Sequence, residues 1–128
     1  MKDWGNMKLL IDTNVVLDVL LRREPFFRTA AEVLNLTQRD EVWEYVSASA
    51  ITDIYYIANK QMKDRDAVRD LLKRLLMIVS VAAVSEREIQ NALNLAWGDF
   101  EDSVQYSVAL LNEMDGIVTR NPSDYQEA

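Results

Sequence analysis

The sequence contains no histidine and no cysteine among its 128 residues. Without histidine, the chain can form neither a serine–histidine or cysteine–histidine catalytic pair nor a histidine-ligated zinc site. Without cysteine, it has neither disulfides nor thiolate metal sites, which suits the reducing cytoplasm, where we expect the protein to be located. Any acid–base or metal chemistry must therefore be built from carboxylates.

Glycine and proline are also scarce, with three and two residues, in a chain that is 49% hydrophobic. This composition is typical of one globular domain with a single core, and no linker or repeat divides it. No apolar run approaches the ~20 residues that cross a bilayer, and residues 1–6 lack the order of a signal peptide. We therefore expect no membrane association.

Acidic residues outnumber basic ones by 21 to 14, which gives a formal net charge of −7. Taken alone, this excess argues against a protein that coats nucleic acid, because phosphate repels a negative surface. The objection weakens if several of the acids bind one metal ion, since the local charge then matters more than the sum.

Hydrophobic patterning predicts short apolar strands that alternate with helices. Strands are expected at residues 7–12, 43–47, 77–84 and 116–119. Helices are expected at 14–23, 26–38, 50–60 (capped by Ser49), 64–76, 85–96 (opened by a Ser85–Glu88 capping box) and 100–112. This alternation predicts a parallel sheet covered by helices on both faces.

Two polar segments follow strands of this predicted sheet. Asp12 ends the first strand, and residues 119–121 follow the last. Ligands of open parallel sheets bind outside the carboxyl ends of the strands, where the chain order reverses. An aspartate there is costly to bury unless a cation pairs with it. A helix cap explains an isolated aspartate equally well, but the position at a strand end favours a ligand.

The segment Asp99-Phe100-Glu101-Asp102 is a second acidic cluster. Asp99 and Asp102 are three residues apart and lie on one side of a first helical turn. Helix capping and the helix dipole offer an alternative explanation for both. Three acids in four residues repel one another, and Mg²⁺ or Mn²⁺, which prefer oxygen ligands, would relieve that repulsion. Glu101 is expected to face solvent.

Three further polar residues are weaker candidates. Asp53 interrupts an apolar helical segment, where the exposed edge of an amphipathic helix is an equally good explanation. Asn121 and Asp124 follow the last strand, and turn chemistry explains both at least as well as metal binding does.

Three segments together resemble the PIN-domain family, as found in VapC-type toxins of bacterial toxin–antitoxin pairs. They are Leu-Leu-Ile-Asp-Thr-Asn-Val-Val-Leu-Asp at 9–18, Asp-Phe-Glu-Asp-Ser-Val-Gln at 99–105 and Ile-Val-Thr-Arg-Asn-Pro-Ser-Asp-Tyr at 117–125. The resemblance implies a three-layer α/β/α sandwich around a parallel sheet of four or five strands. It places one domain at 7–128 and makes residues 1–6 an N-terminal extension or a mis-assigned start. Relatives often carry one more edge strand.

The same resemblance implies an endoribonuclease that depends on Mg²⁺ or Mn²⁺. The first family acid maps onto Asp12, the second, usually a glutamate, onto Asp53, and the third onto Asp102. Asp99 is an additional acid beside the third. The fourth position, often an aspartate, is Asn121 here.

Other residues take supporting roles in this expected site. Asp124 follows Asn121 by three residues, Thr119 resembles the hydroxyl residue that lines the pocket, and Thr13 and Asn14 are expected to orient the acids. Candidates for guiding substrate phosphates are Arg22, Arg23, Arg28 and Arg120, although solvated surface charge is the better explanation for any single one of them.

Expected partners also follow from the resemblance alone: an RNA substrate, a second copy in a homodimer, and a small antitoxin that inserts into the acidic groove. An apolar contact surface is one explanation for Tyr55, Tyr56, Ile57 and Met62, and burial in the core is the other.

A PIN fold that binds protein or RNA without cleaving it is the alternative function. An aspartyl-phosphate enzyme is disfavoured because Asn14 stands where it needs a second aspartate, and no lysine follows the last strand.

Overall fold

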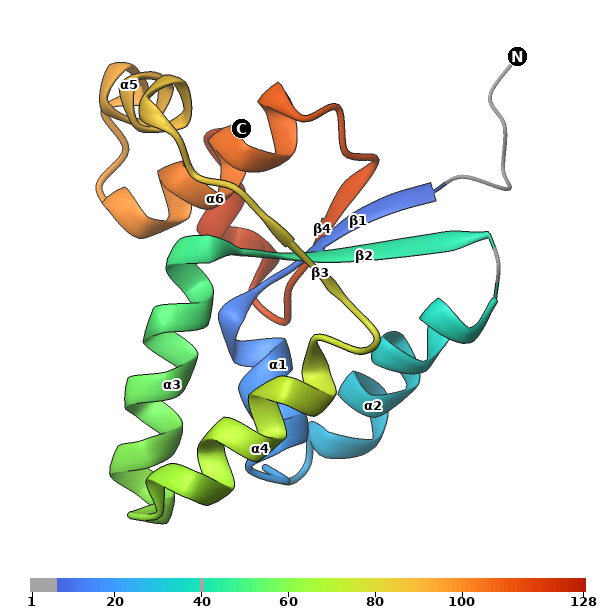
Figure 1. Cartoon of the computed structure of the whole chain (residues 1–128). Coiled ribbons are helices and arrows are strands. Elements are labelled where there is room, and N and C mark those ends of the chain that lie inside the picture. The colour runs from blue at the N-terminus through green and yellow to red at the C-terminus, as the bar shows by residue number, and fades with distance from the viewer. Residues whose placement is uncertain (1–6, 40) are drawn as a thin grey trace.

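The computed structural model describes residues 7–39 and 41–128, so the expected extension at 1–6 lies outside the described residues. A parallel four-stranded sheet forms the middle layer (Figure 1). Its strands are β1 (Met7–Ile11), β2 (Val42–Ser47), β3 (Ser80–Ala82) and β4 (Gly116–Val118), in the order β3-β2-β1-β4. The chain order therefore reverses between β1 and β4, where a ligand site is expected.

Helices cover both faces of this sheet (Figure 1). One face carries α1 (Thr13–Leu20), α2 (Phe27–Asn35), the 3₁₀ turn η2 (Leu36–Gln38), α3 (Ala48–Met62) and α4 (Arg65–Leu75). The other carries α5 (Glu86–Leu95) and α6 (Phe100–Leu111), and the 3₁₀ turn η3 (Pro122–Tyr125) follows β4. The predicted three-layer α/β/α fold is confirmed. Within the described residues, no helix combines the length and apolar character needed to cross a membrane.

The unbroken apolar character of β1 reflects its position between two cores. Leu10 packs with α5 and α6, whereas Ile11 packs with the helices of the opposite face, and both are fully buried. Successive side chains of a strand point to opposite faces, so a central strand must be apolar throughout.

Several predicted boundaries are wrong in detail. The third strand begins only at Ser80, because the amides of Ile78 and Val79 still donate to the carbonyl of Leu75 at the end of α4. The cap of α3 is Ser47, whose hydroxyl accepts from the Ala50 amide at 3.2 Å. The first helix ends at Leu20 rather than at residue 23. The Ser85–Glu88 capping box is confirmed.

Glu44, on β2, is an acid buried within the sheet. Only 2% of its surface is exposed, and neither carboxylate oxygen has a hydrogen-bond partner among the described residues. Burial raises the pKa of Glu44 to about 7, because an unpaired charge is poorly solvated there. In the unfolded chain the same carboxyl ionises near its ordinary value, so folding opposes its ionisation.

Glu44→Gln should therefore flatten the dependence of stability on pH. The folded pKa lies above the unfolded one, so the wild type loses stability as pH rises through about 4.5 to 7, and glutamine removes this loss. Urea unfolding should show the wild type losing on the order of 2 kcal/mol more than Glu44→Gln between about pH 5 and about pH 8. Glu41→Gln, which removes an exposed acid next to the same strand, serves as the control. Equal pH dependence in all three proteins would contradict this account.

A candidate active site at the carboxyl edge of the sheet

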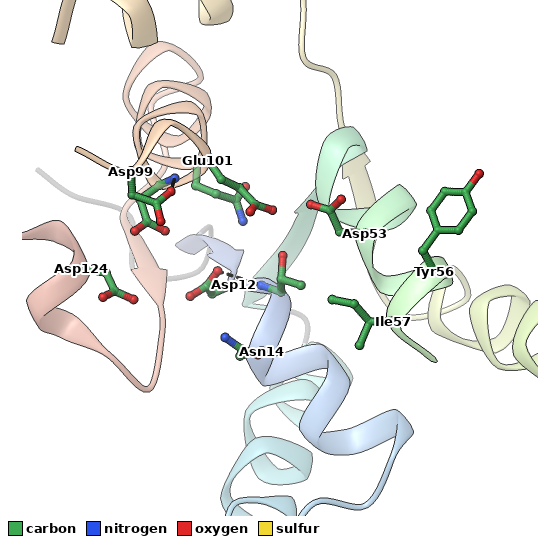
Figure 2. A pocket seen from close by; sticks show the side chains of 11 residues that line it. Asp12, Asn14, Asp53, Tyr56, Ile57, Asp99, Glu101 and Asp124 are labelled. Atoms are coloured by element: carbon green, nitrogen blue, oxygen red, sulfur yellow. Dashed lines mark hydrogen bonds between the residues drawn. The ribbon is translucent and has the colours of Figure 1, made fainter. Parts of the chain in front are cut away.

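A cleft opens at the carboxyl end of β1, between the start of α1, the middle of α3 and the start of α6 (Figure 2). Its volume is about 430 Å³. The lining consists of six acids and five other residues: Asp12, Asp53, Asp99, Glu101, Asp102 and Asp124, with Thr13, Asn14, Tyr56, Ile57 and Gln105. Among residues 7–39 and 41–128, no lysine or arginine lines it. The cleft is therefore strongly negative.

Asp12 lies directly after β1 and caps α1. One carboxylate oxygen accepts from the Thr13 amide at 2.8 Å, and the other accepts from the Thr119 hydroxyl at 2.9 Å. Its own amide donates to the carbonyl of Val118 at 3.0 Å, which continues the pairing of β1 with β4. The side chain is therefore fixed at the point where the chain order reverses, and it is both a helix cap and part of the cleft.

Asp99 and Asp102 reach the cleft from the first turn of α6. Asp99 caps the helix by accepting from the Asp102 amide at 3.0 Å, so the capping explanation also holds for this residue. Burial is the largest cause that raises the pKa of Asp102 to about 6, and the charges of Asp99, Asp124 and Asp12 contribute to this shift in that order. Asp12 and Asp102, 90 residues apart in the sequence, thus lie within electrostatic range of one another.

Asp53 and Glu101 point toward one another across the cleft, from α3 and α6 (Figure 2). A hydrogen bond with the Asp53 carboxyl is the largest cause that raises the pKa of Glu101 to about 7. Burial and the charges of Asp53, Asp99 and Asp102 add to this shift. Glu101 therefore binds a proton more readily near neutral pH than an ordinary glutamate does. Glu101 is exposed, as expected, and it also lines the cleft.

The remaining predicted residues divide into two groups. Thr13, Asn14 and Asp124 line the cleft, the last from η3. Thr119 contributes through its hydrogen bond to Asp12, and its hydroxyl also accepts from the Asn121 amide at 3.1 Å. Asn121 itself does not line the cleft, so Asp124 is the residue after β4 that joins the acids.

Sequence reasoning missed one cleft residue, Gln105. Gln105 is 2% exposed, and neither its amide oxygen nor its amide nitrogen has a hydrogen-bond partner among the described residues. Its spacing of four from Glu101 on an otherwise apolar helix face was the available signal. Tyr56 and Ile57 are exposed and line the cleft, and Met62 at the end of α3 is exposed as well, so core burial is the wrong explanation for these three. Tyr55 does pack against the core.

The arginines near the cleft are held by other contacts. Arg120 lies 3.0 Å from the carboxylate of Asp18, which is 1% exposed, and its guanidinium stacks on the ring of Phe26 at 4.1 Å. Arg23 lies 3.8 Å from the same carboxylate and donates to the side chain of Asn14 at 3.4 Å. Burial raises the pKa of Asp18, and the two arginines oppose this shift. These arginines therefore stabilise the fold and the start of α1.

The donors in the cleft fit a hard divalent cation. The side-chain donors are oxygens apart from the amide nitrogens of Asn14 and Gln105. The pKa of Asp102 is raised by burial and by the neighbouring acids, and that of Glu101 by a hydrogen bond with Asp53, by burial and by the neighbouring acids. In the described part of the chain, no three acidic side chains are positioned to bind one ion together. The arrangement thus suits an ion that takes one or two direct carboxylates and keeps several waters, as Mg²⁺ does.

The sequence matches the family model of the PIN domain over residues 8–123. This chain belongs to the PIN-domain family. No curated protein sequence matches this PIN-domain chain significantly.

Solved structures that share the fold include bacterial toxins. The sarcin–ricin loop-cleaving toxin VapC20 of Mycobacterium tuberculosis has a TM-score of 0.71 at 16% identity, over 92% of this PIN-domain chain and 95% of that one. VapBC2 of Rickettsia felis, bound to a DNA fragment from its promoter, has a TM-score of 0.71 at 15% identity, over 94% and 92%. A toxin–antitoxin complex from Klebsiella pneumoniae has a TM-score of 0.69 at 18% identity, over 92% and 90%. At these identities the likeness is one of fold.

Thr119→Val tests how firmly the PIN-domain site is fixed. The variant removes the hydroxyl that donates to Asp12 and accepts from the Asn121 amide, and it leaves a largely buried carboxylate oxygen without this donor. Urea unfolding should show a loss of about 1 kcal/mol or more. Thr52→Val, an exposed change on α3, should have little effect. Equal losses in the two variants would show that the hydroxyl does not fix Asp12.

Proposed function

We propose that this PIN-domain protein is a divalent-metal-dependent endoribonuclease that hydrolyses phosphodiester bonds in RNA. One observation carries the proposal: six carboxyl groups, from segments far apart in the sequence, surround one cleft that no cationic side chain of the described residues lines. Such a cluster destabilises a fold unless a cation binds to it. The family and the VapC-type neighbours support the assignment to RNA cleavage.

Mg²⁺ or Mn²⁺ is the proposed cofactor, with Asp12 and Asp102 as principal ligands. Asp53 and Asp99 would bind the cation directly or through water, and Asp124 would add negative charge from the outer side of the site. When bound, the cation would activate water and offset negative charge on the phosphate.

The residues around these ligands would position them and move protons. The amide of Thr13 and the hydroxyl of Thr119 hold the Asp12 carboxylate in one orientation, and Asn14 is positioned by Arg23. A proton held by Glu101 would be available to the leaving oxygen, because a catalytic acid is most effective when its pKa lies near the operating pH.

We also propose that the protein is the toxin of a toxin–antitoxin pair in the cytoplasm. Two of the similar structures are toxin–antitoxin systems. A small antitoxin carrying a basic side chain would neutralise the cleft by pairing with its carboxylates, and the exposed Tyr56 and Ile57 would supply apolar contact at its rim. A homodimer remains part of the proposal.

A catalytically degenerate binding module is the alternative function. It is favoured by Asn121, which lies outside the cleft at the family's fourth acidic position. It is also favoured because no three acids of the described residues are positioned to bind one ion together. A titration with Mn²⁺ separates the two functions, because a degenerate site should bind the ion weakly or not at all.

Asp12→Asn and Asp102→Asn should each lower Mg²⁺-dependent RNA cleavage by roughly 100-fold or more, since each removes one carboxylate charge at nearly constant shape. The rate of cleavage of a labelled single-stranded RNA, with Mg²⁺ and with a chelator, measures this effect. Asp70→Asn, which changes an exposed acid on α4, should cleave normally. Full activity in both cleft variants would refute the assignment.

Mg²⁺ or Mn²⁺ should stabilise the fold more at neutral than at acidic pH. The pKa values of Asp102 and Glu101 are raised to about 6 and about 7, so at lower pH protons compete with the cation for these carboxylates. A melting experiment should show a gain of a few °C with excess ion at about pH 7.5 and a smaller gain at about pH 5.5. The gain should disappear in Asp102→Asn. A gain that is independent of pH would place the ion elsewhere.

A further inference from the structure

A second cavity, with a volume of about 280 Å³, adjoins the acidic cleft on the other side of the first turn of α6. We call it the side cavity. It shares Asp99, Asp102 and Asp124 with the cleft, and Trp97 and Gly98 from the α5–α6 connection also line it. A polymeric ligand with one unit bound in the cleft would therefore place the next unit in the side cavity.

The Trp97 indole is a rigid wall of this cavity. Its ring packs against that of Tyr106 with centroids 5.1 Å apart and planes inclined at 30°, and the ring of Tyr125 meets it nearly edge-on at 6.4 Å. The indole is partly exposed, and a Cβ placed on Gly98 would meet no atom within 4 Å. A ring already held by two neighbours loses little conformational freedom when a ligand stacks on it.

The charges around the side cavity narrow the class of ligand. Its acids are the three shared aspartates and Glu127, and among the described residues no lysine or arginine lines it. A phosphate would be repelled there. A flat aromatic ligand can stack on the indole, and an amino group on its edge can donate to the carboxylates.

We propose that the side cavity is a nucleobase subsite, in which the base next to the cleaved phosphate of a single-stranded RNA stacks on Trp97. The inference rests on the proposed nuclease function and adds to it a preference among nucleobases. Adenine, cytosine and guanine carry an exocyclic amino group that can donate to a carboxylate, whereas uracil carries none. The subsite should therefore prefer cytosine to uracil, two bases that differ little in size.

Trp97 fluorescence tests the subsite without cleavage. Replacing the other two tryptophans, as Trp4→Phe and Trp43→Phe together, leaves Trp97 as the single emitter. Nuclease-resistant 2′-O-methyl phosphorothioate tetranucleotides of cytosine and of uracil are titrated in the presence of Mg²⁺. Stacking should quench the emission, and the cytosine probe should bind roughly fivefold more tightly, as one added hydrogen bond gives. No quenching by either probe, or tighter binding of uracil, would overturn the proposal. Quenching by an arginine-containing tetrapeptide and not by RNA would overturn it in favour of a protein partner.

Cleavage kinetics separate this inference from the nuclease proposal. Trp97→Leu should raise KM roughly tenfold and change kcat little, since it removes the stacking surface and leaves the acids in place. Trp97→Phe keeps an aromatic ring, so its KM should be close to that of the wild type. Trp43→Phe, which changes an exposed residue of β2, should leave KM unchanged. Cleavage with an unchanged KM in Trp97→Leu overturns the subsite alone. Quenching by RNA with no cleavage by the wild type supports the subsite and overturns the nuclease proposal.

Discussion

The repulsion among carboxylates at one end of the sheet is the constraint on which this site depends. Asp12 is fixed there by Thr119 across the β1–β4 junction, while Asp99 and Asp102 are fixed by the cap of α6. Burial and the charges of the neighbouring acids raise the pKa of Asp102 to about 6. A hydrogen bond with Asp53, burial and the same repulsion raise the pKa of Glu101 to about 7. The fold tolerates this repulsion because the buried cores on both sides of β1 hold the surrounding helices in place.

The fold was largely predictable because its signals are local. The unbroken apolar character of β1, the capping box at Ser85 and the acidic cap of α6 each identify an element from a few adjacent residues. The boundary errors arise where two nearby residues are equally able to begin or end an element and tertiary packing decides between them. For example, Ser47 rather than Ser49 caps α3. Asp12 and Asp99 were recognisable for the same reason, since each follows or begins a predicted element.

The rest of the site depends on contacts between distant segments. Asp53 on α3 and Glu101 on α6 interact across the cleft. The residues next to each of them in the sequence do not predict this contact. The short turn η3 brings Asp124 to the cleft and leaves Asn121 outside, which the motif alone did not indicate. Arg120 forms an ion pair with the buried Asp18. A residue that the sequence offered as a candidate for binding phosphate therefore has a role in the fold instead.

Binding of Mn²⁺, measured by the loss of the free-ion signal in electron paramagnetic resonance, tests the central claim most directly. The account predicts that the folded wild-type chain binds at least one ion near neutral pH, and that Asp12→Asn loses this binding while it stays folded. A wild-type chain that leaves all Mn²⁺ free would contradict it, because the carboxylates would then surround the cleft without serving to hold a cation.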